Sequence, residues 1–327
     1  MIFLNFLIAF ALIVFVHELG HFLAAKAVGM RVETFSVGFG PRLTGKVFGG
    51  TDYRISLIPL GGYVKMSPEG HSAKPIWQRI FVSLAGPLAN LCFALAILVG
   101  LYAVGVPSLT SRIGNLQPDK PAILSGVMRG DRVVAVNGSD VKFWNELTDA
   151  IGRSKPGTDI RLDLRRGDQA LVVFVRPETR GGKPFIGIAP SDESVTQYFG
   201  MAASLKLGSQ RWWREIESFV GFVSGFVTGA SSAKEIGGPM AIASVANKAA
   251  QSGVGAFILV IAILSVSLGM FNLLPLPILD GGTVLLYLYE GIMGRPIPSG
   301  VLLRLNQAGI MALSLLMAWA FLNDLGR

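Results

Sequence analysis

Charged side chains are scarce in this chain. Asp, Glu, Lys and Arg make up 15% of its 327 residues, whereas hydrophobic residues make up 51%. Soluble globular domains carry about 25% charged residues, so the composition argues against a soluble protein and favours a polytopic membrane protein. The mean hydropathy of +0.53 agrees with this interpretation.

Cysteine is almost absent. The single Cys92 excludes an intrachain disulfide and a thiolate metal cluster. The formal net charge of +8 would suit a nucleic-acid binder, but the sequence has no dense basic tract and no basic patch interleaved with aromatics, so we expect no nucleic-acid partner. Basic residues that flank membrane spans explain the charge better, and they predict the lipid bilayer as the main surroundings.

Four stretches are apolar for long enough to cross a bilayer, which takes roughly 20 residues. They cover about residues 2–28, 80–106, 253–279 and 305–323. The first lacks the basic start and the small-residue cleavage site of a signal peptide, so we expect it to stay in the protein. The chain therefore predicts a polytopic α-helical membrane protein with four transmembrane helices.

Basic residues also indicate which side of the membrane each loop faces. The loop at residues 30–79 holds seven Lys and Arg against three Asp and Glu, and the start of the chain has no basic side chain. The positive-inside rule puts this loop in the cytoplasm. With four spans, the N-terminus, the long segment between the second and third spans, and the C-terminus then lie outside.

Three segments between the spans differ in character. Residues 31–66 predict a β-hairpin too small to stand alone, so we expect it to associate with the helices and the membrane. Residues 107–190 combine strand patterns with one amphipathic helix and predict a small α/β domain inserted on the outer side. Residues 191–252 predict a helical segment on that side, whose apolar stretch 219–233 is either interfacial or inserted.

The sequence HELGH, His17–His21, lies inside the first predicted span. Residues four apart share one face of a helix, so both imidazoles can bind one metal ion, with Glu18 alongside. Zinc suits imidazole ligands, and ionisable groups inside a membrane are costly unless they have partners. The alternative is a pair of histidines hydrogen-bonded to neighbouring helices.

A catalytic zinc site needs a third protein ligand and an open position for water. The remaining histidine, His71, lies in a loop, where a solvated side chain is the ordinary case. Asp280 ends the third predicted span, directly after Pro275 and Pro277, which break a helix. We expect Asp280 to be the third ligand, although a cap at a helix end would also explain it.

Together these features resemble the site-2 proteases, which are intramembrane zinc metalloproteases. The motifs are HExxH in the first span, AGPLAN at Ala85–Asn90 opening the second, and NxxPxxxLDGG at Asn272–Gly282 in the third. The resemblance covers nearly the whole chain and points to the RseP-like branch, with a single PDZ domain at 107–190. It implies a zinc metalloendopeptidase whose protease core comprises residues 1–106 and 253–327.

The resemblance also implies roles for individual residues. The ligands of Zn²⁺ would be His17, His21 and Asp280. Glu18 would be the catalytic base, and Asn272 would contact the substrate or polarise its carbonyl group. Gly38 and Gly40 would belong to a membrane-associated hairpin that meets the substrate.

Substrates in that family are single-span membrane proteins, such as anti-sigma factors already trimmed by a site-1 protease, and remnant signal peptides. The location would be a bacterial inner membrane, with the PDZ domain periplasmic and the active site near the cytoplasmic side. A membrane PDZ scaffold with a structural or transported zinc is the rival hypothesis. A structural zinc prefers four protein ligands, however, and Glu18 would then have no function.

Overall fold

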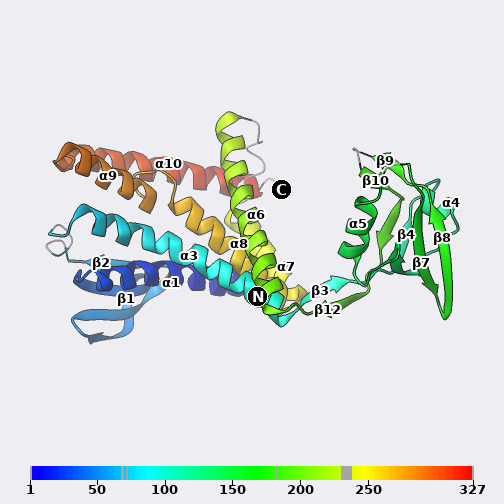
Figure 1. Ribbon diagram of the computed structural model, residues 1–327. Coiled ribbons are helices and arrows are strands. Elements are labelled where there is room, and N and C mark those ends of the chain that lie inside the picture. Colours follow the sequence, from blue (N-terminus) through cyan, green and yellow to red (C-terminus); the bar gives the residue numbers. More distant parts are fainter. Residues whose placement is uncertain are drawn as a thin grey trace. The chain divides into compact units, whose positions relative to one another are not determined.

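The computed structural model describes residues 2–67, 70, 73–155, 157–180, 183–229 and 238–325. The chain forms two compact units, which Figure 1 colours along the sequence. One, here the helical unit, combines Met1–Ala103 with Gly200–Arg327, and the other, the inserted domain, is Val104–Phe199. Each unit has its own core, and the two are described separately below.

Four helices within the described residues are long and apolar enough to cross a membrane, as the sequence predicts. They are α1 (Ile2–Ala27), α3 (Ile76–Val104), α8 (Val254–Asn272) and α10 (Ser299–Leu325). Buried small residues let α1 and α3 pack closely, with Ala24 and Ala25 against Val82. The other end of α3 packs on α8 through Leu98 and Val266.

The third span differs from its prediction. The helix α8 ends at Asn272 rather than near residue 279, and a second helix, α9 (Asp280–Met293), follows after an irregular segment. Pro275 and Pro277 cause this break, because proline has no backbone N–H and cannot continue a helix. Asp280 therefore begins a helix instead of ending one.

Two further helices follow the inserted domain. The expected short apolar helix at 219–233 is part of a much longer one, α6 (Met201–Thr228); residues 230–233 lie outside the described part. Charged residues in α6 lower its hydropathy, so the apolar pattern of the sequence indicated only its end. The Trp212 indole of α6 donates a hydrogen bond to the Leu91 carbonyl of α3 at 2.9 Å. The next helix, α7 (Pro239–Ser252), meets α1 through a 3.2 Å hydrogen bond between Asn5 and Asn247.

The hairpin after α1 covers nearly the predicted residues 31–66. Its strands β1 (Val32–Phe48) and β2 (Thr51–Met66) turn at two glycines, Gly49 and Gly50, both with positive φ. The first part of β1 is paired on both of its edges. One edge pairs with the end of β2, and the other pairs with the start of β2. Consequently the end of β2 forms an outer edge of the sheet, and this edge lies beside α1.

The inserted domain is built around a four-stranded sheet with the strand order β6-β5-β7-β8. A helix, α5 (Trp144–Gly152), buries Leu147 and Ile151 in the same core. The remaining strands form two-stranded pairs, one of which joins the start of the domain to its end. The strands are β3 (Val106–Leu109), β4 (Ile113–Leu116), β5 (Arg132–Val136), β6 (Ser139–Asp140), β7 (Ile160–Arg166), β8 (Gln169–Val175), β9 (Glu178–Arg180), β10 (Lys183–Phe185), β11 (Ile188–Pro190) and β12 (Ser194–Gln197), with a short helix α4 (Pro121–Leu124).

Candidate metal centre

The two histidines of HELGH lie on one face of α1 and are nearly buried, with 8% and 9% of their surfaces exposed. Glycine lets α3 approach this face closely. A Cβ atom on Gly86 would collide with the His21 ring, and one on Gly20 would collide with the Ala85 carbonyl. These glycines are therefore needed for the helix contact that encloses the histidines.

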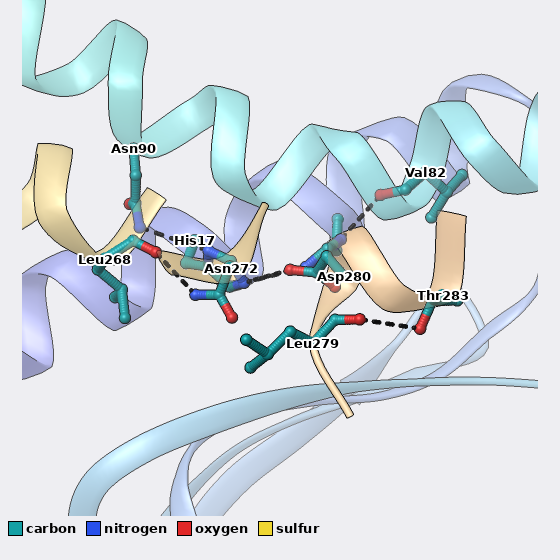
Figure 2. Close-up of polar contacts among 9 residues, drawn as sticks. His17, Val82, Asn90, Leu268, Asn272, Leu279, Asp280 and Thr283 are labelled. Atoms are coloured by element: carbon teal, nitrogen blue, oxygen red, sulfur yellow. Dashed lines mark hydrogen bonds and ion pairs between the residues drawn. The ribbon is translucent and has the colours of Figure 1, made fainter. Parts of the chain in front are cut away.

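Asp280 reaches the histidines from the first turn of α9. Its Oδ2 atom lies 3.1 Å from His17 Nε2, and its Oδ1 atom lies 3.5 Å from His21 Nε2. The two Nε2 atoms are 3.2 Å apart. Figure 2 shows Asp280 and Asn90 both directed at His17.

These separations fit a zinc ion. Ligand atoms about 2.0–2.1 Å from a tetrahedral zinc lie roughly 3.3 Å from one another. The three candidate ligand atoms also converge within 4.8 Å as a group. Two unprotonated imidazole nitrogens in such close contact would repel each other unless a cation lay between them, so the donor set suits zinc.

Partners on α3 leave both Nε2 atoms available for a metal. His21 Nδ1 lies 2.8 Å from the Val82 carbonyl, which can only accept a hydrogen bond, so Nδ1 carries the proton. The amide of Asn90 lies 3.4 Å from His17 Nδ1, and its own Oδ1 is buried without a partner. If the Asn90 side-chain amide is rotated by 180°, its Oδ1 accepts a hydrogen bond from His17 Nδ1–H. His17 Nε2 is then unprotonated and available to a metal, as in His21.

Asn90 has a part in the site that the sequence did not assign. It is fully buried, and its position in AGPLAN was noted only as part of a motif. The available signal was a polar amide inside an apolar span, because such a group requires a partner. The Ser265 hydroxyl on α8 donates to the Asn90 carbonyl at 2.9 Å and ties this residue to a third helix.

Glu18 stands outside the convergent set but lines the same cavity. This cavity has a volume of about 340 Å³, and the end of β2 forms one of its walls. Val64 on that wall lines the cavity together with Glu18. The arrangement places a carboxylate next to, and not among, three potential metal ligands.

The remaining candidates divide between the cavity and the hairpin. Asn272 lines the cavity, and its Nδ2 donates to the Leu268 carbonyl at 3.0 Å. Gly38 and Gly40 are not among the lining residues and have φ angles of +94° and +87°, so local backbone conformation already accounts for them. Their contact with substrate stays a prediction. His71 lies outside the described residues.

The family and the relatives that this chain resembles are all described as peptidases. Peptidase family M50 matches residues 5–316. A relative from Campylobacter jejuni named "Putative zinc metalloprotease Cj1068" is 30% identical over 99% of this chain and 93% of its own. A relative from Clostridium perfringens with the same descriptive name is 32% identical over 98% of this chain and 97% of its own.

Solved structures similar to this chain match a smaller part of it. The crystal structure of the PDZ domain of an SdrC-like protein from Listeria innocua is 21% identical and covers 26% of this chain and 96% of that one, with a TM-score of 0.24. The match to family M50, by contrast, spans both parts of the helical unit. The chain belongs to peptidase family M50, the site-2 protease family of zinc-dependent metalloproteases.

Proposed function

We propose that this protease cleaves peptide bonds within the membrane-spanning segments of single-span proteins. The observation that carries the proposal is the position of the candidate ligands. His17 and His21 lie in the second half of a helix apolar enough to cross a membrane, and Asp280 meets them there. Ionisable groups at such a position are costly and mark a functional site.

The zinc ligands in this proposal are His17, His21 and Asp280. When bound, zinc lowers the pKa of a coordinated water toward neutrality and polarises a substrate carbonyl group. The Val82 carbonyl and the Asn90 amide orient the two imidazoles from the opposite side of each ring. Such partners fix the tautomer of a metal-binding histidine and restrict rotation of its ring.

Glu18 is the proposed general base. Its carboxylate lines the cavity beside the ligands and accepts the proton of the attacking water, then returns it to the leaving amine. Asn272 is the proposed substrate contact. One N–H of its side-chain amide serves the Leu268 carbonyl, and the other is directed to the charge that develops on the substrate oxygen.

A transmembrane substrate must lose its helical hydrogen bonds before its backbone can react. The outer edge of the hairpin offers a place for the unwound segment. Tyr63, Val64 and Met66 on this edge line the cavity, and an open strand edge can pair with an extended peptide. The hairpin would therefore hold the scissile segment extended beside Glu18.

The inserted domain is proposed to act as a periplasmic PDZ-type filter. The positive charge of residues 30–79 supports a cytoplasmic loop, and hence a periplasmic domain, in a bacterial inner membrane. The relatives named above come from bacteria. On this basis the substrates are single-span proteins, of the anti-sigma factor or remnant signal peptide type, whose outer domains a site-1 protease has already trimmed.

The decisive experiment separates metal binding from proton transfer. In Glu18→Gln the side chain keeps its size but loses most of its basicity, so zinc should remain near one per protein while cleavage of a transmembrane substrate stops. In Asp280→Ala a ligand is lost, so zinc retention after mild chelation and cleavage should fall together. Undiminished cleavage by Glu18→Gln would refute Glu18 as the base. Absence of cleavage by the zinc-loaded wild type would instead favour a non-proteolytic zinc-binding scaffold.

A further inference from the structure

The end of β2 presents one edge to β1 and the other to the cavity. Gly62–Lys65 pair with residues of β1 between Thr34 and Val37. On the opposite side of this strand, Tyr63, Val64 and Met66 contribute to the wall of the cavity that contains Glu18. The strand therefore has one hydrogen-bonding edge that β1 does not use.

Alternation along the strand shows which backbone groups face that unused edge. The Ser67 N–H donates to the Arg31 carbonyl at 2.9 Å, so the polar groups of residue 67 point toward β1. In an antiparallel pair, successive residues direct their polar groups to opposite sides. Lys65 then points toward β1 as well, whereas Val64 and Met66 point toward the cavity.

Two observations place this edge against Glu18. Val64, whose N–H faces the cavity, lines that cavity together with Glu18. A Cβ atom on Gly62 would lie 3.1 Å from Glu18 Cγ and 2.8 Å from the Ser36 carbonyl oxygen. The backbone of β2 at Gly62 therefore packs closely against the Glu18 side chain, and a larger residue at position 62 would prevent this approach.

We propose that the Val64 N–H holds the Glu18 carboxylate in its working position, which makes Val64 a positioning residue and Gly62 the residue that allows the contact. This inference rests on the proposed function of Glu18 as the base. A hydrogen bond to a charged acceptor is short and directional, and a base displaced by an ångström loses much of its effect. The hairpin would thereby control the base as well as the substrate.

The contact itself can be tested without catalysis. Amide hydrogen exchange, resolved to single residues, should be measured on the metal-free full-length protein. The Val64 amide should exchange slowly in the wild type and in Glu18→Gln, whose side-chain oxygen still accepts a hydrogen bond, and about tenfold faster in Glu18→Ala. The Met66 amide is the internal control and should not change. Equal exchange at Val64 in all three proteins would overturn the inference.

The role of the contact requires a second experiment. Val64→Pro removes the N–H, and proline is tolerated where an edge strand directs that group away from the sheet. We expect kcat to fall by about 100-fold, with zinc content close to wild type, because a general base contributes about 10²–10⁴-fold. Met66→Pro is the matched comparison, since it removes a cavity-facing N–H away from Glu18, and it should mainly raise KM.

The outcomes distinguish this inference from the function on which it rests. A raised KM with unchanged kcat in Val64→Pro would mean that the N–H serves the substrate, and would overturn the inference. If Val64→Pro loses zinc or fails to fold, Gly62→Ala provides the kinetic test. The same fall in kcat is expected, and a raised KM with unchanged kcat would again overturn the inference. Full activity of Glu18→Gln would refute the proposed base while leaving the exchange result valid.

Discussion

Arg79 of α3 and Glu290 of α9 form a bidentate ion pair. The Nη2–Oε1 distance is 2.6 Å and the Nη1–Oε2 distance is 3.1 Å. The guanidinium group also lies over the Tyr287 ring, 4.9 Å from its centre. Because α9 begins with Asp280, this pair fastens the helix that carries the third candidate ligand to the helix that orients His21.

Breaking this ion pair should loosen the metal centre. The side chains of Arg79 and Glu290 are only 11% and 21% exposed, so Arg79→Gln leaves a largely buried carboxylate without its partner. Such changes cost about 3–5 kcal/mol of stability. We expect a lower unfolding temperature and faster loss of zinc to a chelator. The double variant Arg79→Gln/Glu290→Gln should recover much of the loss, and a double variant as unstable as the single one would contradict the explanation.

Asn90 should control zinc affinity without binding the metal. Asn90→Ala removes the contact with His17 Nδ1, and loss of such a supporting partner typically weakens metal affinity by about 10–100-fold. Competition with a zinc chelator would measure this change. Ser265→Ala is the control, because its hydroxyl contacts the Asn90 carbonyl and not His17. An equal loss of affinity in both variants would indicate a general packing defect.

The two hairpin glycines should differ in their tolerance of alanine. A Cβ atom on Gly38 would lie 2.8 Å from the Ile58 carbonyl oxygen, whereas one on Gly40 would meet only the Ile58 side chain, at 3.8 Å. Both alanines bear the cost of a positive φ, roughly 1–2 kcal/mol. Gly38→Ala should therefore impair cleavage more than Gly40→Ala.

This defect should be smaller on a substrate whose helix Pro or Gly already weakens, since a damaged hairpin would have less unwinding to support. Parallel cleavage assays on matched stable and weakened substrates provide the measurement. Equal losses on the two substrates would point to general misfolding instead.

The inserted domain should lose stability in acid through Asp131. Burial alone would raise the pKa of this carboxyl group, but hydrogen bonds from Arg166 and from the Met128 N–H outweigh burial and hold the pKa below its usual range. The folded domain thus binds this proton more weakly than the unfolded chain does. The stabilisation is present above the ordinary Asp pKa of about 3.9 and is lost as the pH falls below it.

Asp131→Asn should lower the stability of the domain near neutral pH and flatten its dependence on acid. Hydrogen exchange of residues 104–199 in the full-length protein, followed from neutral pH down to about pH 3, would measure both effects. The exposed Asp168→Asn serves as the control and should follow the wild type. A full acid response in Asp131→Asn would assign it to other carboxyl groups.

Spacing and hydropathy predict most of the helical unit, and Pro275 and Pro277 indicate the break before Asp280, but they do not indicate that α8 ends as early as Asn272. The i, i+4 spacing of His17 and His21 requires one helix face, and α1 provides it. Hydropathy alone carried the third span through Pro275 and Pro277, because apolar residues continue beyond the point where the backbone can remain helical. Asp280 was singled out as a candidate ligand, and the structure sets it beside both histidines; its binding of zinc stays a prediction.

The supporting contacts could not be read from the sequence. Asn90 lies 73 residues from His17, and no local pattern joins a buried amide to one particular ring. The Val64 N–H belongs to the backbone, so its direction depends on strand register and not on residue type. Gly38 and Gly40 lie inside β1 with positive φ angles, a backbone conformation that the sequence pattern does not indicate.

The origin of Asp280 in the final helical segments also bears on biosynthesis. His17 and His21 leave the ribosome first, and the whole inserted domain is translated before Asp280 appears. At about 5–20 residues per second, this delay is on the order of tens of seconds. On the proposed ligand set, the emerging chain therefore has two imidazoles and no third ligand until its last segments are made. Cleavage of peptide bonds could then begin only after the inserted domain has been synthesised.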